Sequence, residues 1–347
     1  MAVSSAPQTT NRAGLSKNDY KGAPSTLCSG CGHDAITSQI INAYYNLGIK
    51  PWEVAKVSGI GCSSKSPTYF LNRAHGFNGV HGRMPSLATG VAMANHKLNI
   101  IGVSGDGDSA AIGTGQFVHT MRRNTPMVYI IANNGVYGLT KGQFSPTADA
   151  GSKSKGGRAN EQRPIDICAM AIQLGATYVA RGFSGDPKQL LTLIEGAIAH
   201  KGTALLDVIS PCVTFNNHEG STKSYAYAKE HEIRIHELDL IPHFEPIEVV
   251  GEFEPGQRRE VRLHDGSFLR IHKLEREFDP TSRSQALALC VQAEERQEFL
   301  TGLLYAETDR QDLISGLNVV DEPLATLPDE RVRPSKAALD KIMAELM

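Results

Sequence analysis

A carboxylate and a carboxamide each stand directly after an apolar segment of this sequence. Asp106 lies in a Gly-Asp-Gly-Asp motif that follows the apolar run 100–104, and Asn134 follows the apolar run 127–132. The helical pattern between the two runs has the length needed to bring two parallel strands side by side. Open α/β sheets bind ligands at the carboxyl ends of such strands, so we expect these two side chains to meet there.

The residue types at this expected edge suit a hard divalent cation that carries a phosphate. Mg²⁺ takes an octahedron of oxygen atoms and keeps phosphate oxygens among them. The carboxylate of Asp106, the amide oxygen of Asn134 and the backbone carbonyl of Val136 would supply the protein's share. Gly105 and Gly107 let the backbone approach the phosphates, and a helix N-terminus follows them. Either motif alone is more often a simple turn, but together they indicate a diphosphate site.

Cysteine placement is a second chemical signal. Cys168 and Cys290 lie in apolar helical runs, so we expect them in the core. The other four of the six cysteines lie among Gly, Ser and Pro, where loops are expected: Cys28, Cys31, Cys62 and Cys212. Four thiolates bind either a structural zinc ion or an iron–sulfur cluster. The Cys-x2-Cys pair alone favours zinc or a turn, whereas the spread over three loops favours a cluster against a cofactor.

Bulk composition excludes several classes of function. The 347 residues are 41% hydrophobic and 21% charged, as in an ordinary globular enzyme. A formal net charge of -2 gives no general reason to bind nucleic acid or an anionic membrane. The first twenty residues are polar, and no run approaches the ~18 apolar residues of a membrane span. We therefore expect a soluble, cytoplasmic protein.

Helical and strand patterns alternate through the first two thirds of the chain. Helices are expected at 34–47, 85–95, 113–123, 164–174 and 188–200, and strands at 54–57, 100–103, 127–132 and 204–209. Continuous apolar strands between helices predict an α/β fold with a mostly parallel sheet covered on both faces.

The remaining segments are expected to be peripheral. Residues 142–163 have the composition of a mobile surface loop, 264–267 that of a hairpin turn, and 281–306 and 335–347 that of helices. The predicted division is an N-terminal tail at 1–22, a ligand-binding domain at 23–220 and a C-terminal appendage at 221–347.

The two motifs together resemble a known family. The Gly-Asp-Gly and Asn-Asn motifs resemble the thiamine-diphosphate motif of transketolases, decarboxylases and 2-oxoacid oxidoreductases. With the cysteines added, residues 23–217 resemble the β subunit of the 2-oxoacid:ferredoxin oxidoreductases. The resemblance implies a thiamine-diphosphate-binding fold, Mg²⁺ held by Asp106, Asn134 and Val136, and one [4Fe–4S] cluster. The implied cluster ligands are Cys28, Cys31, Cys62 and Cys212.

The resemblance also implies which residues contact the cofactor. Expected cofactor-binding residues are Ile60, Gly61, Cys62, Ser63, His81, Gly105, Asp106, Gly107, Asp108, Asn134, Val136, Leu139 and Thr140. His81 and Arg83 are further catalytic candidates, although Arg83 is as readily an ordinary residue beside a helix.

The family's reaction is the oxidative decarboxylation of a 2-oxoacid with coenzyme A to an acyl-coenzyme A, CO₂ and reduced ferredoxin, or its reverse. A partner subunit, α or a fused γ–α chain, would supply the pyrimidine-side domain and the activating carboxylate. Lys65 and Lys141 border the expected site, where an ammonium would pair the distal carboxylate of 2-oxoglutarate. The expected substrate is therefore 2-oxoglutarate, which would give succinyl-coenzyme A.

Two other functions are compatible with these residues. One is a non-redox thiamine-diphosphate decarboxylase or carboligase whose cysteines hold a structural zinc. The other is a zinc-stabilised binding subunit without catalytic activity. Iron content separates the first from the oxidoreductase, and Mg²⁺-dependent cofactor binding separates the second.

Overall fold

The fold is that of a computed structural model, which describes residues 9–152, 158–214, 253–262, 268–275, 277–296 and 298–346. The helices of the body are α1 (Gly32–Asn46), α2 (Met84–Ala94), α3 (Thr114–Arg123), α4 (Ile167–Leu174), α5 (Pro187–Ala199) and α6 (Arg283–Arg296). The strands that carry the site are β1 (Val54–Ser58), β3 (Asn99–Gly105), β4 (Met127–Asn133), β7 (Tyr178–Phe183) and β8 (Thr203–Ile209).

One sheet organises the described residues. Its strand order is β2-β1-β3-β4-β8-β7-β11-β10-β9, with β2 (His75–Asn78), β9 (Arg258–Arg262), β10 (Phe268–Lys273) and β11 (Phe299–Ala306) toward the edges. The pairings from β2 through to β7 are all parallel, whereas β11 runs antiparallel to β7 and β9 antiparallel to β10. The mostly parallel α/β prediction is therefore confirmed.

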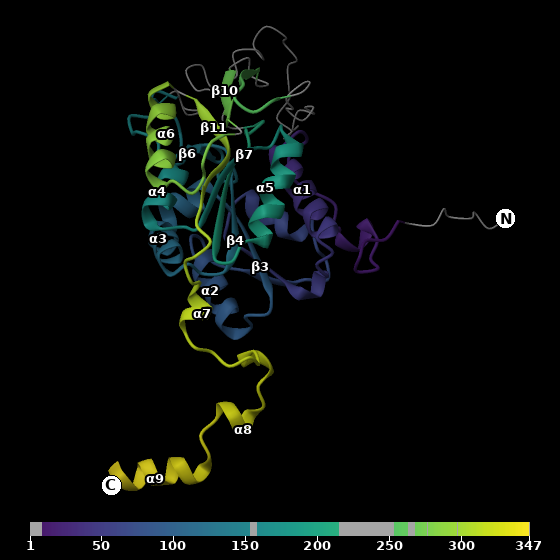
Figure 1. The fold of residues 1–347 in the computed structure, drawn as a ribbon, viewed down its shortest axis with the longest axis vertical. Helices are drawn as coiled ribbons and strands as arrows, with labels where there is room; N and C mark the ends of the chain where they lie inside the picture. Colours follow the sequence, from purple (N-terminus) through teal and green to yellow (C-terminus); the bar gives the residue numbers. More distant parts are fainter. Residues whose placement is uncertain are drawn as a thin grey trace, which may run out of the picture.

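Helices cover both faces of the sheet, as Figure 1 shows. Alternate residues of β4 point to opposite sides because successive side chains of a strand do so. Met127, Tyr129 and Ile131 pack in one core cluster with α2, α3, α4 and α6. Val128 and Ile130 pack in the other cluster with α1 and α5. Burial of both sets explains the continuous apolar run in the sequence.

Several expectations outside the central strands need correction. Residues 281–306 were expected to be helical, but α6 ends at Arg296 and the chain continues as β11. The strands β2 and β7 were not predicted. The C-terminal part contributes β9, β10 and β11, which continue the sheet through the β11–β7 pairing, and the division of the chain at residue 220 stays a prediction. The expected hairpin turn at 264–267 lies outside the described residues.

The predicted mobile surface loop at 142–163 contains several buried residues. Ser145, Ala148 and Asn160 are buried, and the backbone N–H of Ser145 donates to the carbonyl of Gly135 at 3.3 Å. The N–H of Ile165 donates to the carbonyl of Pro146 at 2.8 Å. These contacts pin the described start of the loop against the end of β4.

The C-terminal segment leaves the body after α7 (Leu313–Gly316). Figure 1 shows α8 (Asp329–Val332) and α9 (Lys336–Leu346) reaching away from the sheet. Neither helix contains a buried residue. The predicted helix at 335–347 is confirmed by α9. No helix within the described ranges has the length and apolar character that a bilayer crossing requires.

Asn124 joins several elements at the amino ends of the strands. It ends α3 with a left-handed backbone (φ 51°), which Asn tolerates better than most residues. Its Oδ1 accepts hydrogen bonds from Thr203 N and the Thr177 hydroxyl, both at 2.8 Å. Its Nδ2 donates to the carbonyl of Gln311 at 3.2 Å, which anchors the start of the C-terminal segment.

Asn124→Ala should therefore lower the free energy of unfolding by about 2–4 kcal/mol. The substitution leaves the buried donors of Thr203 and Thr177 without their acceptor and places alanine in a left-handed backbone conformation. Asn318→Ala is the matched control, since Asn318 has the same φ of 51° but is exposed. Urea unfolding of both variants separates the hydrogen bonds from the backbone strain. Equal losses would show that the Asn124 side chain contributes nothing beyond its backbone conformation.

Candidate functional site

Asp106 is the centre of the site, at the carboxyl end of β3. The carboxylate is buried, and its Oδ2 accepts three hydrogen bonds. The donors are the Gly135 backbone N–H (3.1 Å), the Ser145 hydroxyl (2.5 Å) and the Thr147 hydroxyl (2.6 Å). No hydrogen bond to Oδ1 is found from the described part of the chain. One carboxylate oxygen is thus saturated and the other remains for a ligand.

The loop after β4 lies against this carboxylate. Gly105 and Ala132 are register partners in the parallel β3–β4 pair, which confirms that the two motifs follow neighbouring strands. The Asn134 Oδ1 accepts from Val136 N at 3.1 Å, and the Val136 carbonyl accepts from Gly138 N at 3.1 Å. The carboxylate, the amide and the carbonyl that were expected to face a cation therefore lie in one small region.

A cavity of about 90 Å³ lies over this region. It is lined by every residue that the sequence assigned to cofactor binding: Ile60, Gly61, Cys62, Ser63, His81, Gly105, Asp106, Gly107, Asp108, Asn134, Val136, Leu139 and Thr140. The structure brings these residues together, while their roles stay a prediction. His33, Ala132, Tyr137 and Gly138 complete the lining.

The cavity lining combines the Ser63 side chain with the glycine backbone of Gly105 and Gly107, and Ser64 follows Ser63. The hydroxyls of Ser63 and Ser64 are buried and have no hydrogen-bond partner among the described residues. The Ser63 hydroxyl is 3.2 Å from the position that a Cβ on Gly105 would occupy. A Cβ on Gly107 would lie 2.3 Å from the Tyr137 ring, so only glycine fits there. A buried hydroxyl without a partner is costly, and phosphate oxygens would satisfy it. The wall therefore fits a diphosphate with a hard cation.

Asp108 holds His81 in place. Its Oδ1 accepts from the Gly82 N–H at 2.7 Å and pairs with Nδ1 of His81, and its Oδ2 accepts from the Ser104 hydroxyl at 2.5 Å. The carboxylate is therefore fully engaged by protein donors, so its contribution to the cavity is to orient the imidazole. Because Asp108 accepts at Nδ1, Nε2 is the His81 nitrogen left for another contact.

Three other catalytic candidates lie outside the cavity lining. Lys65 is half-buried in the 3-10 helix Ser63–Thr68, and its N–H donates to the Cys62 carbonyl at 3.2 Å. Arg83 is exposed and donates to the carbonyls of Gly82 (3.3 Å) and Ile112 (3.4 Å). Lys141 is exposed in a turn with φ 76°. Of the three, Lys65 is the one that is partly shielded from water.

Four cysteines gather from three loops beside the cavity. Cys62 Sγ and Cys212 Sγ lie 3.5 and 3.9 Å from the position of a Cβ built on Gly138. The pKa of the Cys62 thiol is raised to about 11, mainly by burial and in smaller part by the nearby sulfurs of Cys212, Cys31 and Cys28. The Thr214 hydroxyl donates to Cys28 Sγ at 3.4 Å.

The sulfurs are not in closed ligand geometry. In the described ranges, no three or more side chains of His, Cys, Asp or Glu are arranged to hold a metal ion. The expected Mg²⁺ ligands are of another kind, since Asp106 is the one residue of these four types among them. Cys168 and Cys290 are buried in the core, as predicted.

His33 lines the cavity, although no definite role was predicted for it. Its Nδ1 is 2.7 Å from the Ser210 hydroxyl, and burial lowers the pKa of the imidazole to about 4. His33 is therefore neutral at pH 7. Ser145 and Thr147 were missed as contacts of Asp106; the sequence signal was two hydroxyl residues in a loop that follows the Asn-Asn motif.

A larger cavity of about 760 Å³ lies beyond Asn133 and Thr147. Its wall includes Arg181 of β7, Asp207 of β8 and residues of β9, β10 and α6. The smaller cavity carries the convergent polar groups of both motifs, so we assign the site there despite its size.

Comparisons with known proteins agree with this geometry. Residues 59–208 match the family described as thiamine pyrophosphate enzyme, C-terminal TPP binding domain. The chain is 44% identical over 221 residues to a 2-oxoacid:ferredoxin oxidoreductase subunit beta of Saccharolobus solfataricus, covering 63% of this chain and 70% of that one. It is 34% identical over 250 residues to the 2-oxoglutarate oxidoreductase subunit KorB of Mycobacterium tuberculosis, covering 70% and 65%.

A solved structure is also similar over nearly the whole chain. It is the 2-oxoglutarate:ferredoxin oxidoreductase of Magnetococcus marinus with 2-oxoglutarate, coenzyme A and succinyl-CoA bound. The TM-score is 0.70 at 28% sequence identity, and the match covers 96% of each chain.

Proposed function

We propose that this chain, which belongs to the family of 2-oxoacid:ferredoxin oxidoreductase β subunits, carries thiamine diphosphate, Mg²⁺ and a [4Fe–4S] cluster in an enzyme that oxidises 2-oxoglutarate. The products would be succinyl-coenzyme A, CO₂ and reduced ferredoxin, or the reaction would run in reverse. The observation that carries the proposal is Asp106, a cavity-lining carboxylate whose three hydrogen bonds from the described residues all reach Oδ2 and none Oδ1.

Asp106, Asn134 and the Val136 carbonyl would hold Mg²⁺, because all three offer the hard oxygens that this cation prefers. The Ser63 hydroxyl and the bare backbone at Gly105 would receive the diphosphate. When bound, thiamine diphosphate supplies the electron sink for loss of CO₂ from a 2-oxoacid, and an iron–sulfur cluster accepts the electrons. In this proposal residues 23–220 form the domain that binds both.

His81 is the residue of this chain best placed to hold or move a proton at the site. Asp108 pairs with Nδ1, which leaves Nε2 as the ring nitrogen available to a substrate or cofactor atom. Its side chain is about one third exposed and lies in the cavity lining. His33, neutral and fully buried, instead supports the floor through Ser210.

The site is proposed to be half of an active site. Cofactor pockets commonly enclose about 300–1,000 Å³, more than the roughly 90 Å³ found here. Large apolar side chains at or beside the rim are exposed: Ile60, Val80, Ile112 and Leu139. Such residues suit burial against another subunit. A partner α chain, or a fused γ–α chain, would close the site and supply the carboxylate that activates the cofactor.

The four cysteines of the loops would bind the cluster. They come from the segments before α1, after β1 and after β8, all at the carboxyl edge of the sheet. Cysteines that form no disulfide among the described residues suit a reducing cytoplasm, where ferredoxin would collect the electrons. The zinc alternatives differ from this proposal in metal content.

For the substrate, Lys65 is the proposed partner of the distal carboxylate of 2-oxoglutarate. Two proteins similar to this chain carry 2-oxoglutarate in their names. Lys65 is half-buried and stands three residues after Cys62, at the cavity side that would face the cluster. The distal carboxylate of 2-oxoglutarate needs a charged partner once it is desolvated, whereas the methyl group of pyruvate needs none.

Asp106→Asn tests the cation site with the least disturbance. The amide oxygen can still accept from Gly135, Ser145 and Thr147, while its NH₂ group faces the cation and cannot bind it. Thiamine diphosphate affinity in the presence of Mg²⁺ should fall about ten- to a hundredfold by calorimetry. Binding measured in excess chelator should be the same for both proteins. Unchanged affinity with Mg²⁺ present would rule out Asp106 as a ligand.

Cys212→Ala should remove most of the iron and the visible absorbance of the anaerobically purified complex, because a thiolate ligand is lost. Cys290→Ala is the matched control, since Cys290 is buried in α6 away from the loops. Equal iron loss in both variants, or zinc in place of iron in the parent, would refute the cluster assignment.

Lys65→Ile should lower kcat/KM for 2-oxoglutarate about ten- to a hundredfold, the effect of losing one charge-assisted contact, and spare pyruvate. Lys141→Asn, at an exposed position with positive φ that Asn accepts, should leave both substrates unchanged. Parallel losses for both substrates would make Lys65 a general structural residue.

A further inference from the structure

The two hydroxyls that reach Asp106 come from one short loop. Ser145 and Thr147 flank Pro146, and their Oγ atoms are 3.1 Å apart. Both reach Oδ2 of Asp106, at 2.5 and 2.6 Å, although the residues are 39 and 41 positions from it in the sequence. Asp106 lines the smaller cavity but neither hydroxyl residue does, so both contact the carboxylate from outside the cavity lining.

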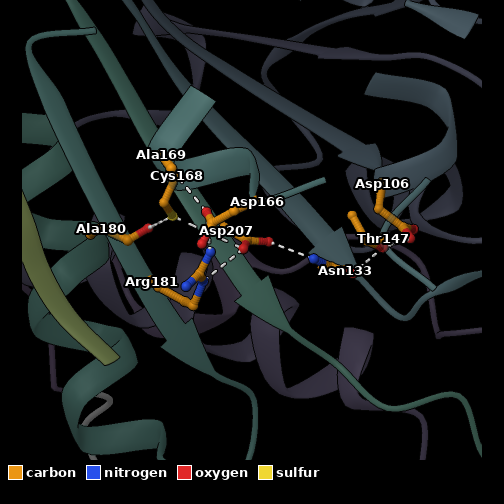
Figure 2. A network of polar contacts seen from close by, with 9 residues as sticks. All are labelled: Asp106, Asn133, Thr147, Asp166, Cys168, Ala169, Ala180, Arg181 and Asp207. Atoms are coloured by element: carbon orange, nitrogen blue, oxygen red, sulfur yellow. Dashed lines mark hydrogen bonds and ion pairs between the residues drawn. The ribbon is translucent and has the colours of Figure 1, made fainter. Parts of the chain in front are cut away.

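A polar chain supports Thr147 from the other side, as Figure 2 shows. The buried Arg181 guanidinium pairs with Asp207 at 2.9 Å and Asp166 at 2.7 Å. Guanidinium is always charged, so a buried one requires anions. Asp207 Oδ1 in turn accepts from Asn133 Nδ2 at 3.0 Å. The anion thereby fixes the orientation of the Asn133 amide, with its oxygen toward Thr147.

This orientation restricts the Thr147 hydroxyl. Its Oγ1 lies 2.9 Å from Asn133 Oδ1 and 2.6 Å from Asp106 Oδ2, and both of these oxygens are acceptors, so the Thr147 hydroxyl can only donate to them. The charged acceptor is the stronger of the two. Thr147 is therefore held as a donor toward Asp106.

We propose that Ser145 and Thr147 are positioning residues for the metal-binding carboxylate, and that the Arg181–Asp207–Asn133 chain keeps Thr147 in the donating arrangement. Two loop hydroxyls and one backbone N–H on a single oxygen fix the rotation of the Asp106 carboxylate and present the other oxygen to the cation. The proposal rests on the proposed function, because it assigns Mg²⁺ with thiamine diphosphate to Asp106. Groups that orient a ligand in this way commonly contribute 10–100-fold to metal affinity.

Thr147→Val and Thr147→Ser form the central comparison. Valine keeps the shape and removes the hydroxyl, whereas serine keeps the hydroxyl and loses a methyl group beside the 760 Å³ cavity. Thr192→Val, on the exposed side of α5, is the matched control for the same change. Binding of thiamine diphosphate to the cofactor-free complex with its partner subunit is measured by calorimetry over a series of Mg²⁺ concentrations.

Thr147→Val should raise the Mg²⁺ concentration needed for half-maximal cofactor binding about tenfold, with binding restored at saturating Mg²⁺. Thr147→Ser and Thr192→Val should match the parent. A Thr147→Val curve equal to the parent's, equal losses in the valine and serine variants, or a loss that saturating Mg²⁺ does not restore would overturn the positioning role. Mg²⁺-independent binding, or none, in the parent itself would instead refute the proposed function.

Discussion

The structure depends on how one buried carboxylate is satisfied. Asp106 stands at the end of a central strand, where an unpaired anion would be costly. Gly135, Ser145 and Thr147 each donate a hydrogen bond to this carboxylate, and all three reach the same oxygen, Oδ2. This asymmetry stabilises the anion and still leaves an oxygen for a cation. The loop after β4 and the start of the next loop are held in place by the same contacts.

Parallel topology explains why chemistry from distant parts of the sequence meets here. The strands β1, β3, β4 and β8 are neighbours in that order and run in the same direction. The loops that follow them therefore open at one edge, where Asp106, Asn134, Cys62 and Cys212 all lie. An electron acceptor placed among the cysteines would adjoin a cofactor placed at Asp106. In the proposed half-site, the opposite wall of this small cavity would come from another subunit, which would cover the exposed apolar rim.

The central strands were predictable because both of their faces are buried, which makes β3, β4 and β8 continuously apolar. Strand β7 escaped prediction because it carries Arg181, whose buried charge is compensated by carboxylates on β8 and before α4. Strand β11 was taken for helix because its apolar residues follow α6 with little interruption. Asp106 and Asn134 were identifiable by type and spacing, whereas the other cofactor-binding candidates of the cavity came from the family resemblance. The hydroxyl contacts of Asp106 were not identifiable, since they depend on how a loop returns across the sheet.

The proposed function requires that one edge of this sheet joins a thiamine-diphosphate site to an iron–sulfur cluster. The most direct test is the visible absorbance of the complex with its partner subunit, loaded anaerobically with thiamine diphosphate and Mg²⁺ and given no ferredoxin. Addition of 2-oxoglutarate and coenzyme A should bleach the iron–sulfur absorbance, because electrons leaving the substrate reach the cluster and go no further. A complex that binds the cofactor and consumes 2-oxoglutarate without any such bleaching would contradict the proposed function.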